Sequence, residues 1–359
     1  MRIKRKGIVC SMILILVLLV GGCGGQPDNG SSPGNEAEKQ AGSTEKAQIT
    51  MYISGPEQMI ADLEKAFEKE RGDVLNILTM GCGPLAQKIN TEAEAGNVQA
   101  DIIWGAEPIL YIQLQQKGLL EQYKSAEAAN LKSELQMGDG YYTICNSRFG
   151  VIAYNKEKVS KEEIPSSWHD LIKENWKNRL AMADAGQSAT ALAITAGLLE
   201  VNGDSWSYIE DLKKNGVLLT KQNNEAIERV STGEVDATIA PHDGILREIK
   251  KSKKSGVESK MALVWPKEGS LSIQRPIAIM ADAGRSEAEQ SVCQEFIDYV
   301  ISSEAQTIMA KYGFIPVRAD VAIPEGVPSN VKSINLDWQQ VASQGKEIRS
   351  NFEKIMLAQ

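Results

Sequence analysis

The sequence contains few cysteines, and the number that lies outside its N-terminal segment is odd. Five cysteines occur in 359 residues. Cys10 and Cys23 lie in the N-terminal segment, which leaves Cys82, Cys145 and Cys293 in the rest of the chain. An odd number excludes a fully paired disulfide framework, so the stability of the fold must come from an ordinary hydrophobic core.

Basic charge is also in short supply. The chain has 39 Lys and Arg against 47 Asp and Glu, a formal net charge of -8. Proteins that bind nucleic acid need a basic face for the phosphates, so no nucleic-acid partner is expected. The one basic cluster, residues 247–254, is interrupted by Glu248 and Ser252. We interpret it as the solvated end of a helix.

A long apolar run occurs only once, at the N-terminus. Basic residues between Arg2 and Lys6 precede the apolar stretch 8–20, which is shorter than the roughly 20 residues that span a bilayer. This pattern predicts a cleaved secretory signal peptide, residues 1–22. The ending Gly21-Gly22-Cys23 resembles a lipobox, so Cys23 is the predicted lipidation site. Residues 23–48 have almost no side chains to bury, and we expect a flexible tether to the cell membrane.

The remaining residues, from Ile49 onward, alternate short apolar runs with helical patterns, which indicates an α/β fold. Pro56 follows Ser54-Gly55 and precedes Glu57, a pattern that predicts a capping box and a helix start. One long helix is predicted from Ser286 to about Tyr312.

The pattern changes near Phe149, where we expect the chain to cross to a second lobe. Lobe 1 is predicted to be discontinuous, residues 49–148 and 276–359, and lobe 2 to be residues 149–275. In open α/β sheets, ligands bind at the carboxyl ends of strands. Helix starts there offer unpaired N–H groups to an anion. The candidates are Ser54 and Gly55, Cys82 and Gly83, and Ser188, Ala189 and Thr190.

Five segments, in order, resemble landmarks of the extracellular solute-binding proteins of the ferric-iron, thiamine, aminoethylphosphonate and hexose-phosphate group. They are residues 100–105, 150–155, 165–171, 231–237 and 312–318. The resemblance implies a two-lobed type II periplasmic-binding-protein fold, each lobe a mixed sheet flanked by helices, with hinge strands between. It also implies a monomer without cofactor or enzymatic activity. Such a protein lies outside the cell membrane and delivers a small solute to an ABC permease, which works with an ATPase.

The ligand predicted from this resemblance is a phosphate- or phosphonate-bearing organic solute. Ferric relatives hold iron through two adjacent tyrosines, but here the corresponding stretch contains His242 and Asp243. A His-Asp pair is similar to that of relatives which bind phosphorylated solutes, and Glu268 falls where those relatives have a further carboxylate. Glu107 matches the region of a ferric-family carboxylate ligand.

Three alternatives remain open. A metal site would group Cys82, Cys145, His242 and Asp243, unless Cys82 and Cys145 form a disulfide. A hydrolase would use Cys82 as nucleophile with His242 as base and Asp243 as orienting group.

A thiamine site is the third alternative, and it would need aromatic side chains to sandwich the ring. Trp104, Trp168 and Tyr142 are the candidates. Each is a more natural core residue than a stacking platform.

Overall fold

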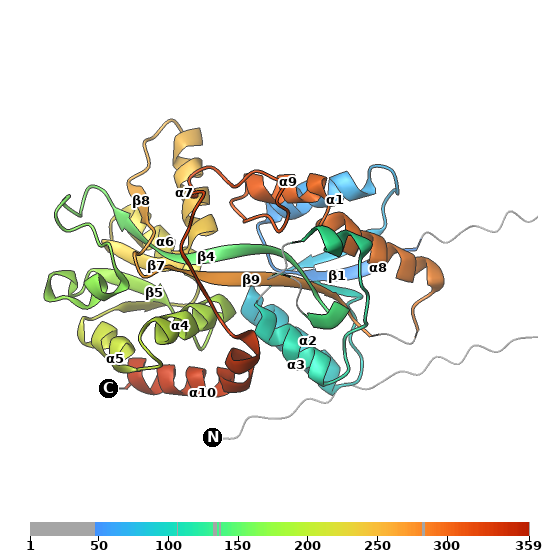
Figure 1. Ribbon diagram of the computed structural model, residues 1–359, viewed down its shortest axis with the longest axis horizontal. Coiled ribbons are helices and arrows are strands. Elements are labelled where there is room, and N and C mark those ends of the chain that lie inside the picture. The colour runs from blue at the N-terminus through green and yellow to red at the C-terminus, as the bar shows by residue number, and fades with distance from the viewer. Residues whose placement is uncertain (1–46, 106, 132–134, 136–137, 282–283, 359) are drawn as a thin grey trace, which may run out of the picture. The chain divides into compact units, whose positions relative to one another are not determined.

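Two long strands, β4 (Thr143–Asn155) and β9 (Ser270–Ile279), run antiparallel and side by side through the centre of the sheet (Figure 1). The computed structural model describes residues 47–105, 107–131, 135, 138–281 and 284–358. All of them belong to one compact unit, Lys46–Gln359. The predicted signal peptide, nearly all of the tether and Cys23 lie outside the described residues.

In the described part of the chain, ten strands form one mixed sheet with the order β2-β1-β3-β9-β4-β7-β5-β6. Besides β4 and β9, the strands are β1 (Ile49–Ile53), β2 (Leu75–Thr79), β3 (Ile102–Trp104), β5 (Leu180–Ala183), β6 (Leu218–Thr220), β7 (Ala237–Pro241), β8 (Met261–Val264) and β10 (Ser333–Asn335). β8 pairs with β4, and β10 pairs with β9.

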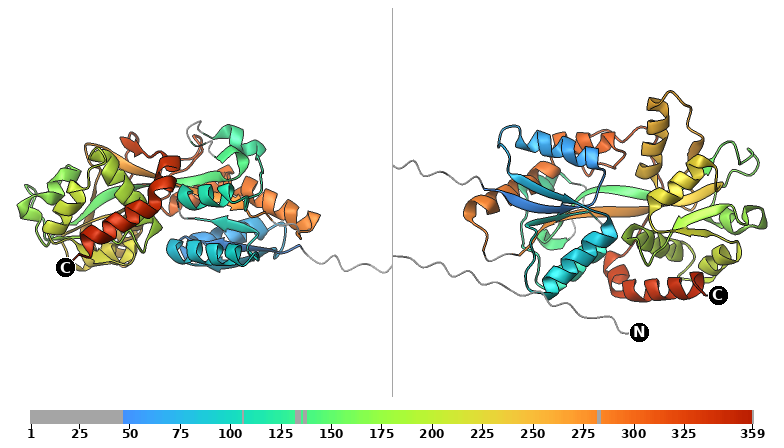
Figure 2. Two further views of the ribbon diagram at one scale, coloured as in Figure 1. Left: turned by 90° about the horizontal axis from the view of Figure 1, so that it is seen from below. Right: turned by 180° about the vertical axis from the view of Figure 1, so that it is seen from behind.

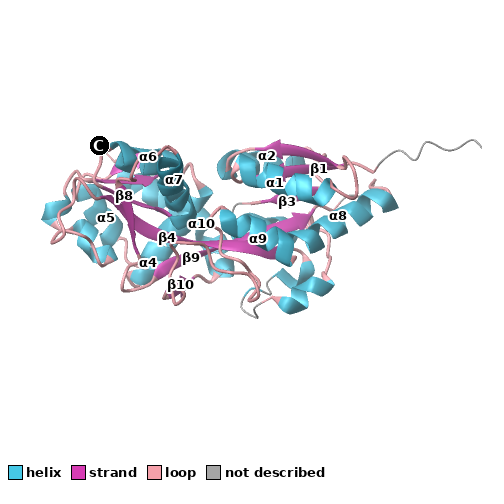
Figure 3. Ribbon diagram, turned by 90° about the horizontal axis from the view of Figure 1, so that it is seen from above, coloured by secondary structure: helices cyan, strands magenta, loops and turns pink. Residues whose placement is uncertain are grey.

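Helices cover both faces of the sheet (Figure 3). They are α1 (Glu57–Glu68), α2 (Cys82–Glu94), α3 (Pro108–Gln116), α4 (Ala189–Val201), α5 (Ser207–Lys214), α6 (Asn223–Thr232), α7 (His242–Lys254), α8 (Glu287–Val300), α9 (Ser303–Lys311) and α10 (Trp338–Met356). Short 3-10 helices lie at η1 (Ala126–Asn130), η3 (Gly138–Gly140), η4 (Trp168–Ile172) and η5 (Glu174–Trp176). Within the described residues, no helix is long and apolar enough to cross a membrane.

The sheet confirms the predicted α/β class, and β4 and β9 join its two halves. The half with β1, β2 and β3 is parallel within itself, and so is the half with β5, β6 and β7. β4 pairs with β9 through Thr143–Gly150 and with β7 through Gly150–Tyr154. β9 in turn pairs with β3, so the two adjacent strands link the halves and are a natural place for bending.

Two predictions about helix boundaries are wrong. The N-cap of α1 is Pro56, and no side chain caps the helix, so the predicted capping box does not form. The predicted long helix is two helices, because the Ser302 hydroxyl accepts a hydrogen bond from the Ala305 N–H and starts α9.

The C-terminal helix α10 lies against elements from both halves of the sheet. It contacts α3, which follows β3, and it also contacts α4 and α5 (Figures 1 and 2). The lobe boundaries remain a prediction. They assign residues 276–359, and hence α10, to lobe 1, although α10 also contacts α4 and α5 in the other half.

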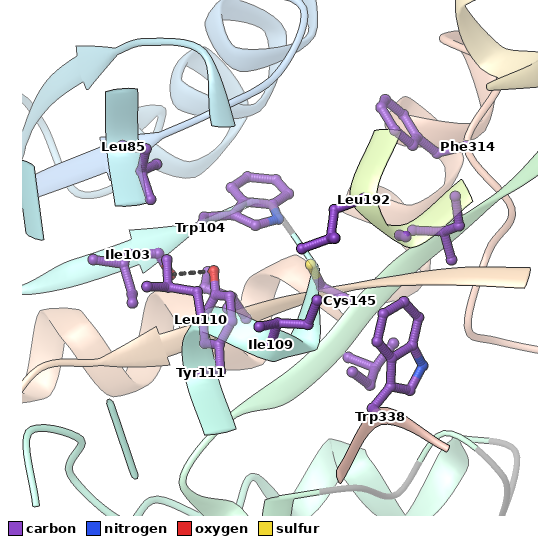
Figure 4. Packing of buried hydrophobic residues seen from close by; sticks show 14 of the residues in the cluster. Leu85, Ile103, Trp104, Ile109, Leu110, Tyr111, Cys145, Leu192, Phe314 and Trp338 are labelled. Carbon is purple, nitrogen blue, oxygen red and sulfur yellow. Dashed lines mark hydrogen bonds between the residues drawn. The ribbon is translucent and has the colours of Figure 1, made fainter. Parts of the chain in front are cut away.

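One large hydrophobic core extends across β4 and β9, and a smaller one lies between α6, α7 and the second half of the sheet. Figure 4 shows Trp104, Tyr111 and Cys145 packed against Leu192 and neighbouring aliphatic side chains. The candidate thiamine platforms Trp104, Trp168 and Tyr142 are all buried, with at most 2% exposure. They are therefore core residues, which is the role that the sequence favours over a stacking platform.

Candidate ligand-binding site

A cavity of about 400 Å³ lies where the carboxyl ends of strands from both halves of the sheet meet. We call it the arginine chamber. Its lining includes Ser54, Gly55, Cys82, Arg148, Ser188, Thr190, Gln222, Asp243, Arg247 and Phe314. Six of the residues predicted from helix starts and from the His-Asp pair are thus brought together, although they lie up to 189 positions apart (from Ser54 to Asp243).

Five helices, α1, α2, α4, α6 and α7, begin at the arginine chamber, and their first turns supply it with N–H groups of positive partial charge. The chamber is lined by Glu57 of α1, Cys82 of α2, the α4 N-cap Ser188 and the α6 residue Asn223. The Ser188 hydroxyl accepts hydrogen bonds from the Ala191 N–H (3.3 Å) and from Asn223 Nδ2 (3.2 Å). Ser188 therefore caps α4, and its hydroxyl hydrogen remains available to an acceptor in the cavity.

Three guanidinium groups surround the ring of Phe314 at one wall of the chamber. The guanidinium carbons of Arg148, Arg247 and Arg275 lie 5.4, 5.9 and 4.8 Å from the centre of that ring. Arg275 is only 1% exposed, and it donates hydrogen bonds to the Ser54 carbonyl and, at 3.5 Å, to Asn146 Oδ1. Burial and the neighbouring charge of Arg148 lower the pKa of Arg275.

Asp243 is the carboxylate that pairs with two of these arginines. Its Oδ2 accepts a hydrogen bond of 2.6 Å from Arg247 Nη1, and its Oδ1 lies 3.9 Å from Arg148 Nε. Burial alone would raise the pKa of Asp243, but the charges of Arg148 and Arg247 outweigh burial and lower it. Arg148 Nε, Arg275 Nε and Asp243 Oδ1 are all buried without a hydrogen-bond partner. A buried polar atom of this kind is costly unless a partner arrives.

A second cavity of about 750 Å³ adjoins the first, and we call it the amide chamber. Its lining includes Gly83, Gln87, Asn90, Glu107, Gln113, Gln187, Ala189, Lys221, Gln222, Lys346 and Arg349. Gln222 lines both chambers. Between them, α2 approaches the loop before α4 so closely that a Cβ on Gly83 would lie 2.8 Å from the Gln187 carbonyl oxygen.

Glu107 is the buried acid of the amide chamber, with 2% exposure. It occupies the N-cap position of α3, but its side chain makes no cap hydrogen bond. Its Oε1 accepts a hydrogen bond of 2.5 Å from the Thr190 hydroxyl, and its Oε2 has no partner. Burial raises the pKa of Glu107, although Thr190 and the arginine charges oppose this.

Two predicted ligand residues line neither chamber. His242 is fully buried between Phe149 and Trp265, and its Nδ1 accepts a hydrogen bond of 2.9 Å from the Phe149 N–H. Burial lowers the pKa of His242 to about 4. Glu268 accepts hydrogen bonds from the Ser167 hydroxyl and from the Trp168 N–H, and so it holds the start of η4 instead.

The cysteines do not form the groupings that the alternatives require. Cys82, Cys145 and Cys293 are all free thiols, so the suggested disulfide between Cys82 and Cys145 is absent. The Cys145 thiol is buried and donates to the Arg275 carbonyl at 3.1 Å. Among the described residues, no three His, Cys, Asp or Glu side chains cluster in a way that could hold a metal ion.

The sequence did not point to Arg148, Arg275 or Phe314. Arg275 stands within the uninterrupted buried strand β9, and an arginine in such a strand was the signal available. The basic cluster 247–254 is interpreted from the sequence as the solvated end of a helix. This is wrong for Arg247, the first residue of the cluster, which donates a hydrogen bond to Asp243, whereas Lys251 and Lys254 are exposed.

Residues 98–344, more than half of the chain, match the family model of bacterial extracellular solute-binding proteins. The chain belongs to this family. It is 23% identical over 303 residues to a probable ABC transporter periplasmic-binding protein, y4fP, of Sinorhizobium fredii, with 80% of each chain covered. It is 24% identical to the Fe(3+)-binding periplasmic protein of Serratia marcescens, covering 83% of this chain and 85% of the relative.

The fold is that of type II periplasmic binding proteins. The structure of the periplasmic binding protein AfuA from Actinobacillus pleuropneumoniae, with fructose-6-phosphate bound, superimposes with a TM-score of 0.76. The two chains are 20% identical, and the match covers 88% of this chain and 100% of AfuA. The relatives are named as binding proteins, and none of these three is named as an enzyme.

Proposed function

We propose that this protein is the solute receptor of a bacterial ABC importer and that its solute is a small organic molecule with a phosphate or phosphonate group. The arginine chamber is the observation that carries the proposal. Arg148, Arg247 and the starts of five helices line this cavity, and Arg148 Nε is buried there without a hydrogen-bond partner. Guanidinium groups and helix N-termini are the two donors that bind tetrahedral oxyanions best.

The remainder of the solute would occupy the amide chamber. Side-chain amides at Gln87, Asn90, Gln113 and Gln187 can donate to and accept from hydroxyl groups. Glu107 Oε2 lacks a donor, which a hydroxyl or ammonium group on the solute would supply. The combined space exceeds that of a bare phosphate ion, so an organic phosphate suits it better.

The two chambers also suggest how binding is coupled to delivery. Lining residues come from both halves of the sheet, and β4 and β9 connect those halves. A ligand that contacts both halves would favour their closed arrangement, as in hinge-type receptors. We infer that the closed form is the one that an ABC permease recognises, with residues 49–148 and 276–359 acting against residues 149–275.

The anchor and location follow from the N-terminus. We propose that Cys23 carries a diacylglyceryl group and holds the receptor on the outer face of the membrane as a monomer, with residues 24–48 as tether. A diacylated cysteine gives stable attachment, because two chains bind a bilayer far more strongly than one.

A thermal-shift panel on metal-free protein tests the ligand class. The panel contains glucose 6-phosphate, 2-aminoethylphosphonate, thiamine, ferric citrate and zinc. A solute at 100 times its Kd adds about 2.7 kcal/mol to the free energy of unfolding. We expect a shift with a phosphorus-containing solute, and a shift with iron, zinc or thiamine alone would overturn the proposal.

A pair of variants on α7 tests the site itself. Arg247→Gln removes a cation of the arginine chamber, while Lys251→Gln removes an exposed cation one turn further along the same helix. Hydrogen bonds to charged groups contribute about 1.5 to 3 kcal/mol. Arg247→Gln should therefore weaken binding of the phosphorus-containing solute by about 10- to 150-fold. Equal affinity in both variants would remove Arg247 from the site.

A further inference from the structure

Asp243 is the buried carboxylate of the arginine chamber, and a carboxylate does not suit a negatively charged ligand. The other carboxylate in its lining, Glu57, is exposed to solvent, and the charged and polar lining otherwise includes guanidinium groups and helix N-termini. Asp243 lines this cavity with a side chain that is 1% exposed. A buried negative charge at an anion site needs a reason, since it reduces the attraction for any anion.

Only one of its two oxygens is used by the protein. Oδ2 accepts from Arg247, whereas Oδ1 has no hydrogen-bond partner, and Arg148 Nε lies 3.9 Å from it, beyond hydrogen-bond distance. A carboxylate oxygen can only accept a hydrogen bond. The arginines keep this group ionised, since their charges lower the pKa of Asp243 despite its burial. The missing partner is therefore a donor.

Oxyanions differ in whether they bring such a donor. Phosphate monoesters and phosphonates lose their second proton near neutral pH, with a pKa of about 6 for phosphate esters. A monoanion with a P–O–H group is therefore available to bind. Sulfate esters and sulfonates have no proton at neutral pH, so each oxygen that they place near Oδ1 is a bare acceptor. Two acceptors facing each other in a buried site are strongly unfavourable.

We infer that Asp243 selects for oxyanions that carry a proton, so that the chamber binds phosphate and phosphonate groups and rejects sulfate and sulfonate groups. The ligand's P–O–H donates to Asp243 Oδ1, while its remaining oxygens accept from Arg148, Arg247 and the helix starts. This inference rests on the proposed function and adds a specificity to it. It assigns Asp243 to the acidic hydroxyl of the anion, where the sequence suggested hydroxyl or amine groups elsewhere on the solute.

Matched pairs of solutes test the inference at pH 7 and fixed ionic strength by isothermal titration calorimetry on the full-length mature protein. The pairs are 2-aminoethylphosphonate with 2-aminoethanesulfonate and glucose 6-phosphate with glucose 6-sulfate. Sites built around a hydrogen-bond donor on the ligand reject analogues that lack it by factors of about 10⁴. We expect the phosphorus member of at least one pair to bind at least about 100-fold more tightly than its sulfur analogue.

Asp243→Asn supplies the second readout. An amide can donate to a bare sulfonate oxygen, so this variant should bind the sulfur member and reduce the preference to about tenfold or less. Glu107→Gln is the matched control, because it also converts a buried carboxylate at the cavities into an amide. It should weaken both members of a pair by the same factor and leave their ratio unchanged. Circular dichroism and melting curves confirm that each variant folds.

The outcomes separate the two proposals. Similar affinities for the two members of a pair in the native protein would overturn the selection by Asp243 and leave the proposed function standing. A preference that persists unchanged in folded Asp243→Asn would also overturn it. Failure of every phosphorus and sulfur solute to bind would overturn the proposed function and this inference with it.

Discussion

Gly83 provides a direct test of whether the two halves of the molecule press together around a ligand. A Cβ at this position would lie 2.8 Å from the Gln187 carbonyl oxygen, about 0.6 Å inside the 3.4 Å at which ordinary van der Waals contact begins. The clash is with backbone, which cannot rotate away as the end of a flexible side chain can. Gly83→Ala must therefore separate α2 from the loop before α4.

The expected size of the effect follows from the cost of overpacking. Forcing an extra methyl group into a packed contact costs about 1 to 3 kcal/mol. If the contact forms only when the halves close, this cost falls on the liganded form alone. The Kd for the phosphorus-containing solute should then rise about 5- to 150-fold. The stability of the ligand-free protein should stay the same or increase, because alanine favours a helix over glycine.

Calorimetric titration measures the Kd, and urea unfolding without ligand measures the stability. Gly81→Ala is the comparison variant, since its Cβ would meet nothing nearer than Pro84 Cδ at 3.6 Å. Any change common to both variants reports a methyl group near the ligand, and the excess in Gly83→Ala reports the contact. An unchanged Kd would refute the reasoning. A loss of stability in the ligand-free protein would show that the contact is permanent instead.

Three further predictions concern His242, Cys82 and Cys23. Burial lowers the pKa of His242 to about 4, so its stabilising effect is complete above the unfolded-state pKa of about 6.5 and is lost as pH falls toward 4. Between pH 6.5 and 5 the native protein should lose about 2 kcal/mol more in urea unfolding than His242→Gln, and equal losses would contradict this. Cys82→Ser should bind the solute within about threefold of the native protein, because a hydroxyl replaces the thiol at a helix start that already supplies backbone donors; a loss of binding would give the thiol a role of its own. Cys23→Ala should move the protein from the membrane fraction to the medium or periplasm in cell fractionation, and continued membrane association would exclude lipid anchoring at Cys23.

The sequence predicted the elements well where a single pattern decides them. The alternation of short apolar runs with helical patterns predicted the α/β class, and strands such as β1, β5 and β7 are apolar runs of this kind. The break between α8 and α9 was missed because the apolar periodicity continues through it, while a single hydroxyl, that of Ser302, decides where the new helix begins. Local hydrogen bonds of this kind are weak signals beside hydrophobic periodicity.

The site was predicted in part, for a similar reason. Helix starts after strands are visible in a sequence, so Ser54, Cys82, Ser188 and Thr190 could be grouped from the sequence alone. The arginines could not, because their meeting at Phe314 depends on segments that lie far apart in the chain. Glu268 lines neither chamber, and nothing in the sequence indicated this, because a carboxylate that receives hydrogen bonds from Ser167 and Trp168 looks the same in sequence as one that awaits a ligand.

The position of β9 sets the order in which the protein can fold. β9 lies between β3 and β4, so the sheet has no continuous centre until residues 270–279 have joined it. α10 then has to cover α3, α4 and α5, and it follows the other helices of the described residues in chain order. Nearly the whole polypeptide must therefore be available before either half is complete. Contacts between segments that lie far apart in the chain form slowly, so we expect the sheet to fold only after most of the chain has been synthesised.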